Sequence, residues 1–207
     1  MLLYYKPGAC SLSVRIVLTE LGLPFQAIKV DTDRGTTENG ADFRAINPKG
    51  YVPALALEPA TVLTENPAVL QFLADRAPRA GLAPANGTIE RVRLQEWLNF
   101  TSAELHKAFG PWFSGRTLEG DERSRAEATL HRRIGDVERG LGDGRWFILG
   151  DAFSVADAYL FVVLNWAGFI GLDLARWPQL AAYVARVAAR PSVRSAMAEE
   201  GLLRAAA

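Results

Sequence analysis

The chain has few residues of the kinds that build disulfides and metal centres. Its 207 residues include one cysteine, Cys10, and two histidines, His106 and His131. A single cysteine excludes an internal disulfide and is typical of proteins kept in a reducing compartment. A zinc site needs three or four ligands at short spacings, which two histidines and a distant cysteine do not supply. The sequence therefore predicts neither a disulfide nor a metal.

An excess of charge of one sign is lacking as well. The 23 Lys and Arg residues balance 23 Asp and Glu residues, and no basic run marks a nucleic-acid footprint. No apolar stretch approaches the length needed to cross a bilayer. The apolar run at the start is broken at Pro7, which is too soon for a signal peptide. We therefore expect a cytoplasmic protein with no nucleic-acid and no membrane partner.

The first 77 residues alternate between strand and helix signals. Apolar runs bounded by Pro and Gly indicate strands, and helical spacing of apolar residues indicates helices. This order predicts a compact mixed sheet with helices, an α/β N-terminal domain with the thioredoxin-like arrangement. The signals fall at residues 2–5 (strand), 11–21 (helix), 25–30 (strand), 42–45 (short helix), 54–57 and 61–63 (a hairpin around Glu58-Pro59-Ala60) and 68–76 (helix).

The remainder of the chain is helical in pattern. Residues 78–87 are rich in Pro, Gly and Ala and predict a linker between residues 1–77 and an all-α C-terminal helical bundle over 88–207. Ser154 and Asp157 have the spacing of a capping box at the start of an apolar helix. We expect these two residues to be structural. A first long helix over 88–109 has apolar positions at helical spacing, namely Leu94, Leu98, Thr101, Leu105 and Ala108.

Val52-Pro53 and the helix start near Glu65 together indicate a peptide-binding edge. If the Val52–Pro53 peptide bond is cis, the Val52 N–H and C=O face outward, where another peptide backbone can pair with them. Asn66 and Pro67 fit the N-cap and N1 positions of a helix, whose free N–H groups favour a carboxylate. Glu65 is either a solvated charge or the partner of a ligand ammonium group. The pattern predicts a small acidic peptide as ligand.

Cys10 follows the first strand and opens the first helix. The N-terminus of a helix stabilises a thiolate. With Ser13 it forms Cys-Ser-Leu-Ser, a Cys-x-x-Cys motif whose second cysteine is replaced by serine. Such a site can form a mixed disulfide but cannot close an internal one. The alternative is that Cys10 is a small buried hydrophobic residue.

A polar face of the long helix carries the first histidine. At about 100° per residue, Asn99, Ala103 and His106 cluster within about 60° of one another, with Lys107 beside them. This face points away from the apolar stripe of the helix. It is either an exposed surface or part of a binding site.

The residues placed so far resemble those of the glutathione S-transferases, and more narrowly of the bacterial beta class. The resemblance covers essentially the whole chain, and several segments match in register. They are Tyr4-Tyr5, Gly8-Ala9-Cys10-Ser11-Leu12-Ser13, Asn47-Pro48-Lys49-Gly50-Tyr51-Val52-Pro53, Thr64-Glu65, residues 96–100 and 104–107, and residues 154–161.

The resemblance implies a homodimeric detoxification enzyme that conjugates the glutathione thiolate to hydrophobic electrophiles. Glutathione is then a co-substrate, and no other cofactor is expected. We assign catalysis to Cys10, Ser11 and His106. The electrophile pocket is assigned to Phe109, Trp112 and Phe113. The residues expected to bind glutathione are Tyr5, Ala9, Cys10, Tyr51, Val52, Pro53, Glu65, Asn66, Asn99, Ala103, His106 and Lys107.

Two departures and two rival functions accompany this prediction. Relatives often carry a lysine where this chain has Gly35, with Arg34 or Lys49 as candidate replacements, and some carry glutamine in place of Tyr51. The first rival is a monothiol, glutaredoxin-like thiol–disulfide oxidoreductase that uses Cys10. The second is a non-catalytic ligand-binding module, because a fold alone does not fix a function.

Overall fold

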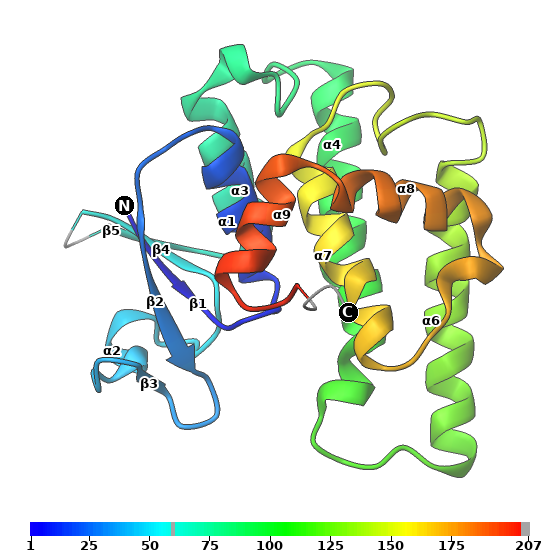
Figure 1. Ribbon diagram of the computed structural model, residues 1–207, viewed down its shortest axis with the longest axis horizontal. Coiled ribbons are helices and arrows are strands. Elements are labelled where there is room, and N and C mark those ends of the chain that lie inside the picture. Colours follow the sequence, from blue (N-terminus) through cyan, green and yellow to red (C-terminus); the bar gives the residue numbers. More distant parts are fainter. Residues whose placement is uncertain (59–60, 204–207) are drawn as a thin grey trace. The chain divides into compact units, whose positions relative to one another are not determined.

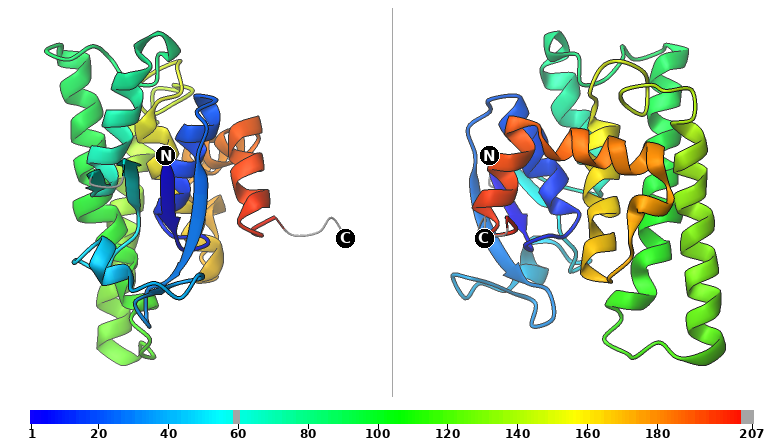
Figure 2. Two further views of the ribbon diagram at one scale, coloured as in Figure 1. Left: turned by 90° about the vertical axis from the view of Figure 1, so that its left-hand side faces the viewer. Right: turned by 45° about the vertical axis from the view of Figure 1, so that its right-hand side comes forward.

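The computed structural model describes residues 1–58 and 61–203, and the chain divides into two compact units. The first unit combines Met1–Ala83 with the segment Ala189–Ala207, and the second is Pro84–Ala188. The C-terminal segment was expected in the helical domain. It belongs with the first unit because helix α9 (Pro191–Glu199) packs against helix α1 (Ser11–Glu20), as Figures 1 and 2 show.

The first unit is built on a five-stranded sheet in the order β3-β2-β1-β4-β5 (Figure 1). The first two strands are parallel, and every other neighbouring pair is antiparallel. The predicted strands and hairpin are confirmed, although Pro59 and Ala60 of the expected turn lie outside the described residues. The strands are β1 (Leu2–Tyr5), β2 (Gln26–Asp31), β3 (Thr36–Thr37), β4 (Ala54–Glu58) and β5 (Thr61–Thr64).

Helices complete a thioredoxin-like unit, as predicted. Helix α1 packs against α3 (Asn66–Arg76) and α9, and the short η1 (Pro78–Ala80) follows α3. The small helix α2 (Phe43–Ile46) places its Phe43 ring 5.7 Å from the Tyr4 ring in a buried cluster with Val30 and Ala54.

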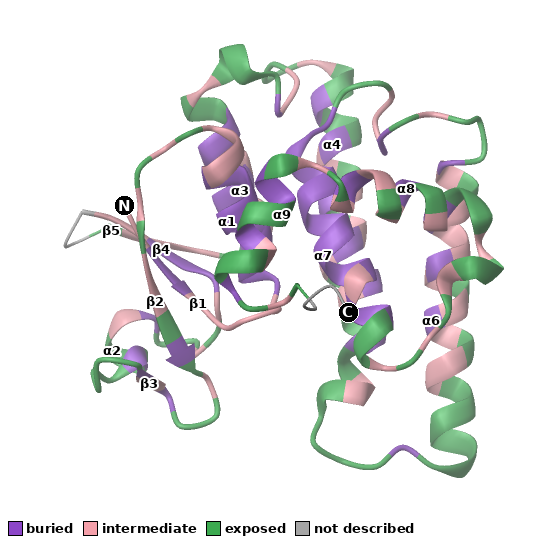
Figure 3. Ribbon diagram, in the orientation of Figure 1, coloured by how far each residue is buried: buried purple, intermediate pink, exposed green. Residues whose placement is uncertain are grey.

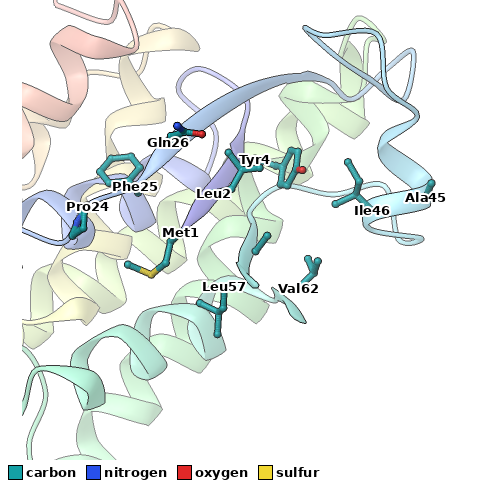
Figure 4. Close-up of a pocket in the computed structure, with 11 residues that line it drawn as sticks. Met1, Leu2, Tyr4, Pro24, Phe25, Gln26, Ala45, Ile46, Leu57 and Val62 are labelled. Atoms are coloured by element: carbon teal, nitrogen blue, oxygen red, sulfur yellow. The ribbon is translucent and has the colours of Figure 1, made fainter. Parts of the chain in front are cut away.

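A groove of about 960 Å³ lies beside this cluster (Figure 4). None of the predicted site residues lines it, so it belongs to a different part of the unit. Its lining residues are Met1, Leu2, Tyr4, Pro24, Phe25, Gln26, Ala45, Ile46, Ala56, Leu57 and Val62.

The second unit is helical, as expected. Its central helix α7 is buried along most of its length (Figure 3) and contacts α4 and α8. No helix in residues 1–58 and 61–203 is both long and apolar enough to cross a membrane. Its elements are α4 (Ile89–Phe100), η2 (Thr101–Leu105), α5 (His106–Phe109), η3 (Gly110–Phe113), α6 (Gly120–Gly140), α7 (Val155–Phe169), η4 (Leu174–Arg176) and α8 (Pro178–Ala188).

The long helix expected over 88–109 is interrupted. Residues Thr101–Leu105 form a π-helical turn between α4 and α5, and π turns are frequent at functional sites. The five apolar positions predicted for this helix are nevertheless all buried. The extra residue in the turn changes the angular spacing on which the expected clustering of Asn99, Ala103 and His106 was based.

The start of α7 has the predicted capping box. Asp157 accepts from the Ser154 backbone N–H at 2.8 Å and from the Ser154 hydroxyl at 2.7 Å. It also accepts from the Ile148 N–H at 2.8 Å and the Tyr183 hydroxyl at 3.0 Å. Burial raises the pKa of the Asp157 carboxyl and, more strongly, that of the Tyr183 hydroxyl. Asp157 therefore joins three separate segments of the second unit.

Candidate active site

Cys10 stands at the junction of the β1–α1 loop and α1. It occupies the N-cap position, and its side chain is almost buried, with 9% of the residue exposed. Its Sγ donates to the Val52 carbonyl at 3.4 Å. The sequence predicted that this carbonyl would be unpaired, and the thiol is the partner that it did not foresee. A thiolate has no proton to donate and would lose this hydrogen bond.

The two serines that follow Cys10 are committed to the fold. Ser11 is fully buried, and its hydroxyl donates to the Lys6 carbonyl and accepts from the Lys6 N–H, both at 3.3 Å. This geometry favours a structural role for the Ser11 hydroxyl over the predicted catalytic one. Ser13 donates to the Cys10 carbonyl at 2.7 Å and accepts from the Asn66 amide at 2.9 Å. These bonds join the start of α1 to the start of α3.

The expected cis peptide bond joins Val52 and Pro53. The preceding loop is held by Asn47, which is 2% exposed and whose side-chain amide donates to the Tyr51 carbonyl at 2.7 Å. The backbone carbonyl of Asn47 accepts from the Gly50 N–H at 2.9 Å, in a turn where Gly50 has φ +71°. Within residues 1–58 and 61–203, the Val52 N–H has no hydrogen-bond partner. A rigid loop thus presents one backbone donor for an added strand.

The start of α3 differs by one residue from the predicted cap. Glu65, not Asn66, is the N-cap, because the Asn66 side chain is buried and turned to Ser13 of α1. Glu65 has φ +67°, a left-handed conformation that is uncommon for residues other than glycine. Its carboxylate forms an ion pair with Lys49 at 2.6 Å. In the described part of the chain, the N–H groups of Glu65 and Asn66 have no partner.

Three further residues of the first unit that were predicted to bind glutathione differ from one another in exposure and in contacts. The Tyr5 ring packs beneath the Arg15 guanidinium, 4.4 Å from its centre. Ala9 is half-buried in the β1–α1 loop, and its N–H donates to the Lys6 carbonyl. Tyr51 is 69% exposed at the end of the loop before Val52.

Arg44 lies against Gly35, the position where the resemblance implies a lysine in other members of the family. Its guanidinium lies against two glycines of positive φ, so that a Cβ on Gly35 would lie 3.5 Å from Nε and one on Gly50 would lie 3.4 Å from Nη1. The candidates named from the sequence are paired elsewhere, Arg34 with Asp31 at 3.6 Å and Lys49 with Glu65. Arg44 is therefore the cation nearest to this position whose side chain has no hydrogen bond or ion pair within the described residues.

The remaining predicted residues lie in the second unit. Asn99, Ala103 and Lys107 are exposed, whereas His106 is partly buried and its Nδ1 is 2.8 Å from the Tyr159 hydroxyl. Burial, aided by the charge of Lys107, lowers the pKa of His106 to about 4. The imidazole is therefore neutral at pH 7. When Tyr159 donates to Nδ1, the imidazole proton is on Nε2, which is then a donor.

Two of the three predicted electrophile residues contact Trp166. Its ring makes edge contacts with Phe109 at 5.9 Å and Phe113 at 5.6 Å. Phe109 is fully buried, so its contact with an electrophile stays a prediction. Phe113 is 53% exposed, and Trp112 is partly exposed. Trp166 was missed because it lies among apolar residues of α7 that read as core.

Metal chemistry finds no support in the residues described. No group of three or more His, Cys, Asp or Glu side chains in residues 1–58 and 61–203 is arranged to hold an ion. In the first unit the thiol and the backbone donors are the groups that can act on a ligand, and in the second unit it is the neutral imidazole.

Comparison with known proteins identifies the class. Residues 8–76 match the glutathione S-transferase N-terminal domain, and residues 120–186 match the glutathione S-transferase C-terminal domain. The chain belongs to the glutathione S-transferase family, and it is a glutathione-conjugating enzyme.

Particular relatives cover nearly the whole chain. It is similar to glutathione S-transferase GstA of Escherichia coli O157:H7, with 46% identity over 98% of this chain and all of the relative. A sphingomonad glutathione S-transferase complexed with glutathione is 44% identical, with a TM-score of 0.91. The bacterial beta class glutathione S-transferase of Sphingomonas chungbukensis is also 44% identical, with a TM-score of 0.92. Both structures cover 98% of this chain and 100% of their own.

Proposed function

We propose that the first unit binds glutathione as an added strand along Val52. The observation that carries the proposal is that three backbone donors, the N–H groups of Val52, Glu65 and Asn66, have no hydrogen-bond partner among the residues that the structure describes. The cysteinyl backbone of glutathione pairs with the Val52 N–H. The γ-glutamyl carboxylate accepts from the N–H groups of Glu65 and Asn66, where the dipole of α3 adds a favourable interaction.

Glu65 binds the γ-glutamyl ammonium group in this proposal. Its carboxylate is 61% exposed and already holds one cation, that of Lys49. The left-handed backbone of Glu65 supports a functional role, because such a conformation is retained where a site requires it.

The glycyl carboxylate is assigned to Arg44. Gly50 lies two residues before Val52 in the loop, and in glutathione the glycine directly follows the cysteine that pairs with Val52. The Arg44 guanidinium rests on Gly50 and offers a planar pair of donors to a carboxylate. This assignment names the group that replaces the lysine absent at Gly35.

The conjugation step requires glutathione to react as a thiolate. Lowering a thiol pKa from about 8.5 by about two units takes about 2.7 kcal/mol. Hydrogen bonds to a charged group contribute about 1.5–3 kcal/mol each, so one or two donors suffice. We assign one such donor to the Ser11 N–H at the start of α1, which has no partner among the described residues, and the catalytic role expected of His106 in the second unit stays a prediction from the sequence. Phe113 and Trp112 are proposed to contact the hydrophobic electrophile.

A second activity is proposed for Cys10. Its position at the start of α1 favours a thiolate, which can attack the mixed disulfide between glutathione and a substrate thiol. That attack forms a Cys10–glutathione bond and releases the substrate thiolate. A free glutathione thiolate then breaks the Cys10–glutathione bond and leaves as glutathione disulfide, so glutathione is the reductant. A non-catalytic role is disfavoured because Cys10, Val52 and Glu65 are all retained.

We also propose that the enzyme is a homodimer of the beta class that serves detoxification in the cytoplasm. The likeness to the beta class structure of Sphingomonas chungbukensis supports the class assignment.

The test is the conjugation of glutathione to chlorodinitrobenzene by wild type and Cys10→Ala, measured side by side. Activity that survives the substitution supports a thiolate held by the surrounding donors. Loss in the variant alone would show that the Cys10 sulfur takes part directly. Absence in both proteins would contradict conjugation of aromatic electrophiles, and disulfide reduction would then be measured.

A further inference from the structure

The end of α9 reaches the loop that carries Cys10. Glu200, the residue that caps α9, has a fully buried carboxylate. One of its oxygens accepts from the Gly8 N–H at 2.9 Å, and the other accepts from the Arg15 Nε at 3.0 Å. A side chain that is 192 residues away in sequence therefore holds the backbone two residues before Cys10.

Arg15 of α1 forms ion pairs with both glutamates at the end of α9. Its side chain is 5% exposed, and it donates from Nη1 to Glu199 at 2.8 Å. Its guanidinium also lies over the Tyr5 ring, at the end of β1. The strand end, the loop and the first helix are thus held around one buried cation.

A second contact fixes the other end of α9. Glu20, at the end of α1, accepts from the Arg190 guanidinium and the Ser192 hydroxyl, at the start of α9. The two helices lie side by side (Figures 1 and 2), joined by charged groups at both ends. Because α9 is held at its start by Glu20, its end is fixed in position, and the Glu200 carboxylate lies at the Gly8 N–H.

Stability alone does not account for this arrangement. Burying a charged pair has a desolvation cost that often equals its attraction, and burial raises the pKa of the Glu200 carboxyl. What the pair adds is geometry, because it holds the N–H of Gly8, which has φ +72° in the loop before Cys10. Both family matches, over residues 8–76 and 120–186, leave Glu200 outside.

We propose that Glu200, oriented by Arg15, is a positioning residue that fixes the Gly8–Cys10 loop and thereby sets the reactivity of the Cys10 thiol. The proposal deepens the proposed function, since it rests on a chemical role for Cys10. The chain offers a matched control in Glu199, which binds the same arginine but does not touch the loop.

The experiment compares Glu200→Gln with Glu199→Gln in the full chain. Glutamine keeps the size of the side chain but has one oxygen, so it cannot accept from both Gly8 and Arg15. The first readout is hydrogen exchange of the Gly8–Ser11 amides. The second is the pH profile of Cys10 alkylation by iodoacetamide without glutathione. Melting curves establish that both variants are folded, and Glu200→Asp replaces Glu200→Gln if the latter is not.

We expect loop exchange to rise at least about fivefold in Glu200→Gln, the effect of one lost hydrogen bond, and the alkylation profile to shift. Glu199→Gln leaves both unchanged. Equal loop exchange in the two variants overturns the proposal. Faster exchange with an unshifted alkylation profile also overturns it, since Glu200 would then be structural only. Neither readout uses the transferase reaction, so failure of the proposed function would be seen separately in the conjugation assay.

Discussion

Two helix starts in this molecule differ in how the backbone N–H groups of their first turn are satisfied. The start of α7 is closed, because Asp157 and Ser154 form a buried capping box that also binds Ile148 and Tyr183. The start of α3 is open, because its N-cap Glu65 makes no side-chain cap and two backbone N–H groups have no partner in the described residues. A closed start holds a fold together, whereas an open start keeps donors for a ligand.

The backbone conformations of the two N-cap residues differ as well. Ser154 has φ −132°, an ordinary extended conformation, whereas Glu65 has φ +67°. A residue with a side chain at positive φ costs about 1–2 kcal/mol, and among the described residues of the first unit Glu65 alone, apart from glycines, has such a φ. An unsatisfied, strained helix start is therefore a better guide to function than a helix start alone.

The largest effect is expected from opening the closed start. Asp157→Ala leaves buried donors of three segments unpaired, and the free energy of unfolding should fall by about 3–5 kcal/mol. A cap by itself would contribute only about 1 kcal/mol. Urea unfolding measures the change, with the exposed Asp151→Ala as control. A fall in the free energy of unfolding of 1 kcal/mol or less would show that Asp157 acts as a helix cap and does not stabilise the contacts with Ile148 and Tyr183.

The next effect concerns His106, which is bound to Tyr159 of α7. Because its pKa is lowered from 6.5 to about 4 in the folded state, the unfolded chain takes up the proton first as pH falls. The stability contribution is complete above pH 6.5 and is lost as pH falls toward 4, by up to about 3 kcal/mol. His106→Gln should remove this slope and His131→Gln should keep it. An unchanged slope in His106→Gln would contradict the burial of a neutral imidazole.

A smaller effect is expected from the open start, and it appears in binding instead of folding. Glu65→Gln removes the charge that meets the ligand ammonium, and glutathione affinity should fall about 10- to 100-fold, or about 1.5–3 kcal/mol. Calorimetry measures the affinity, and the exposed Glu90→Gln serves as control. Equal affinity in the two variants would remove Glu65 from the site.

The smallest effect separates strain from charge at the same residue. Glu65→Gly and Glu65→Ala both lose the carboxylate, but only glycine adopts φ +67° without strain. Glu65→Gly should be more stable than Glu65→Ala by about 0.5–1 kcal/mol in urea unfolding, with similarly weak glutathione binding. Alanine equal to or better than glycine would argue that the conformation carries no strain.

Much of the architecture could be predicted because it follows from local patterns. Apolar spacing located α1, α3 and α7, and the Ser154–Asp157 spacing located a cap whose partners Ile148 and Tyr183 are distant in sequence and gave no signal. The two-residue strand β3 was missed because it is too short for a pattern. The π turn at Thr101–Leu105 was missed because its apolar positions keep a helical spacing.

The sequence predicted several residues of the proposed site but few of the contacts that those residues make. Cys10, Val52 and Glu65 were found from turn, strand and helix signals, and the family resemblance joined them. Arg44 and Glu200 were missed, since an exposed arginine on a short helix and a glutamate near the C-terminus look like ordinary surface charges. Their roles depend on tertiary packing, which places one against Gly50 and the other against Gly8.

The most direct test of the open start is a glutathione titration followed by amide NMR of the full chain. At saturation, the account predicts the largest shifts and the strongest slowing of hydrogen exchange at the amides of Val52, Glu65 and Asn66. The capping box amides of Ser154 and Asp157 should not change. Saturation that leaves the three first-unit amides unchanged would contradict the account, because glutathione would then bind without the donors that define the site.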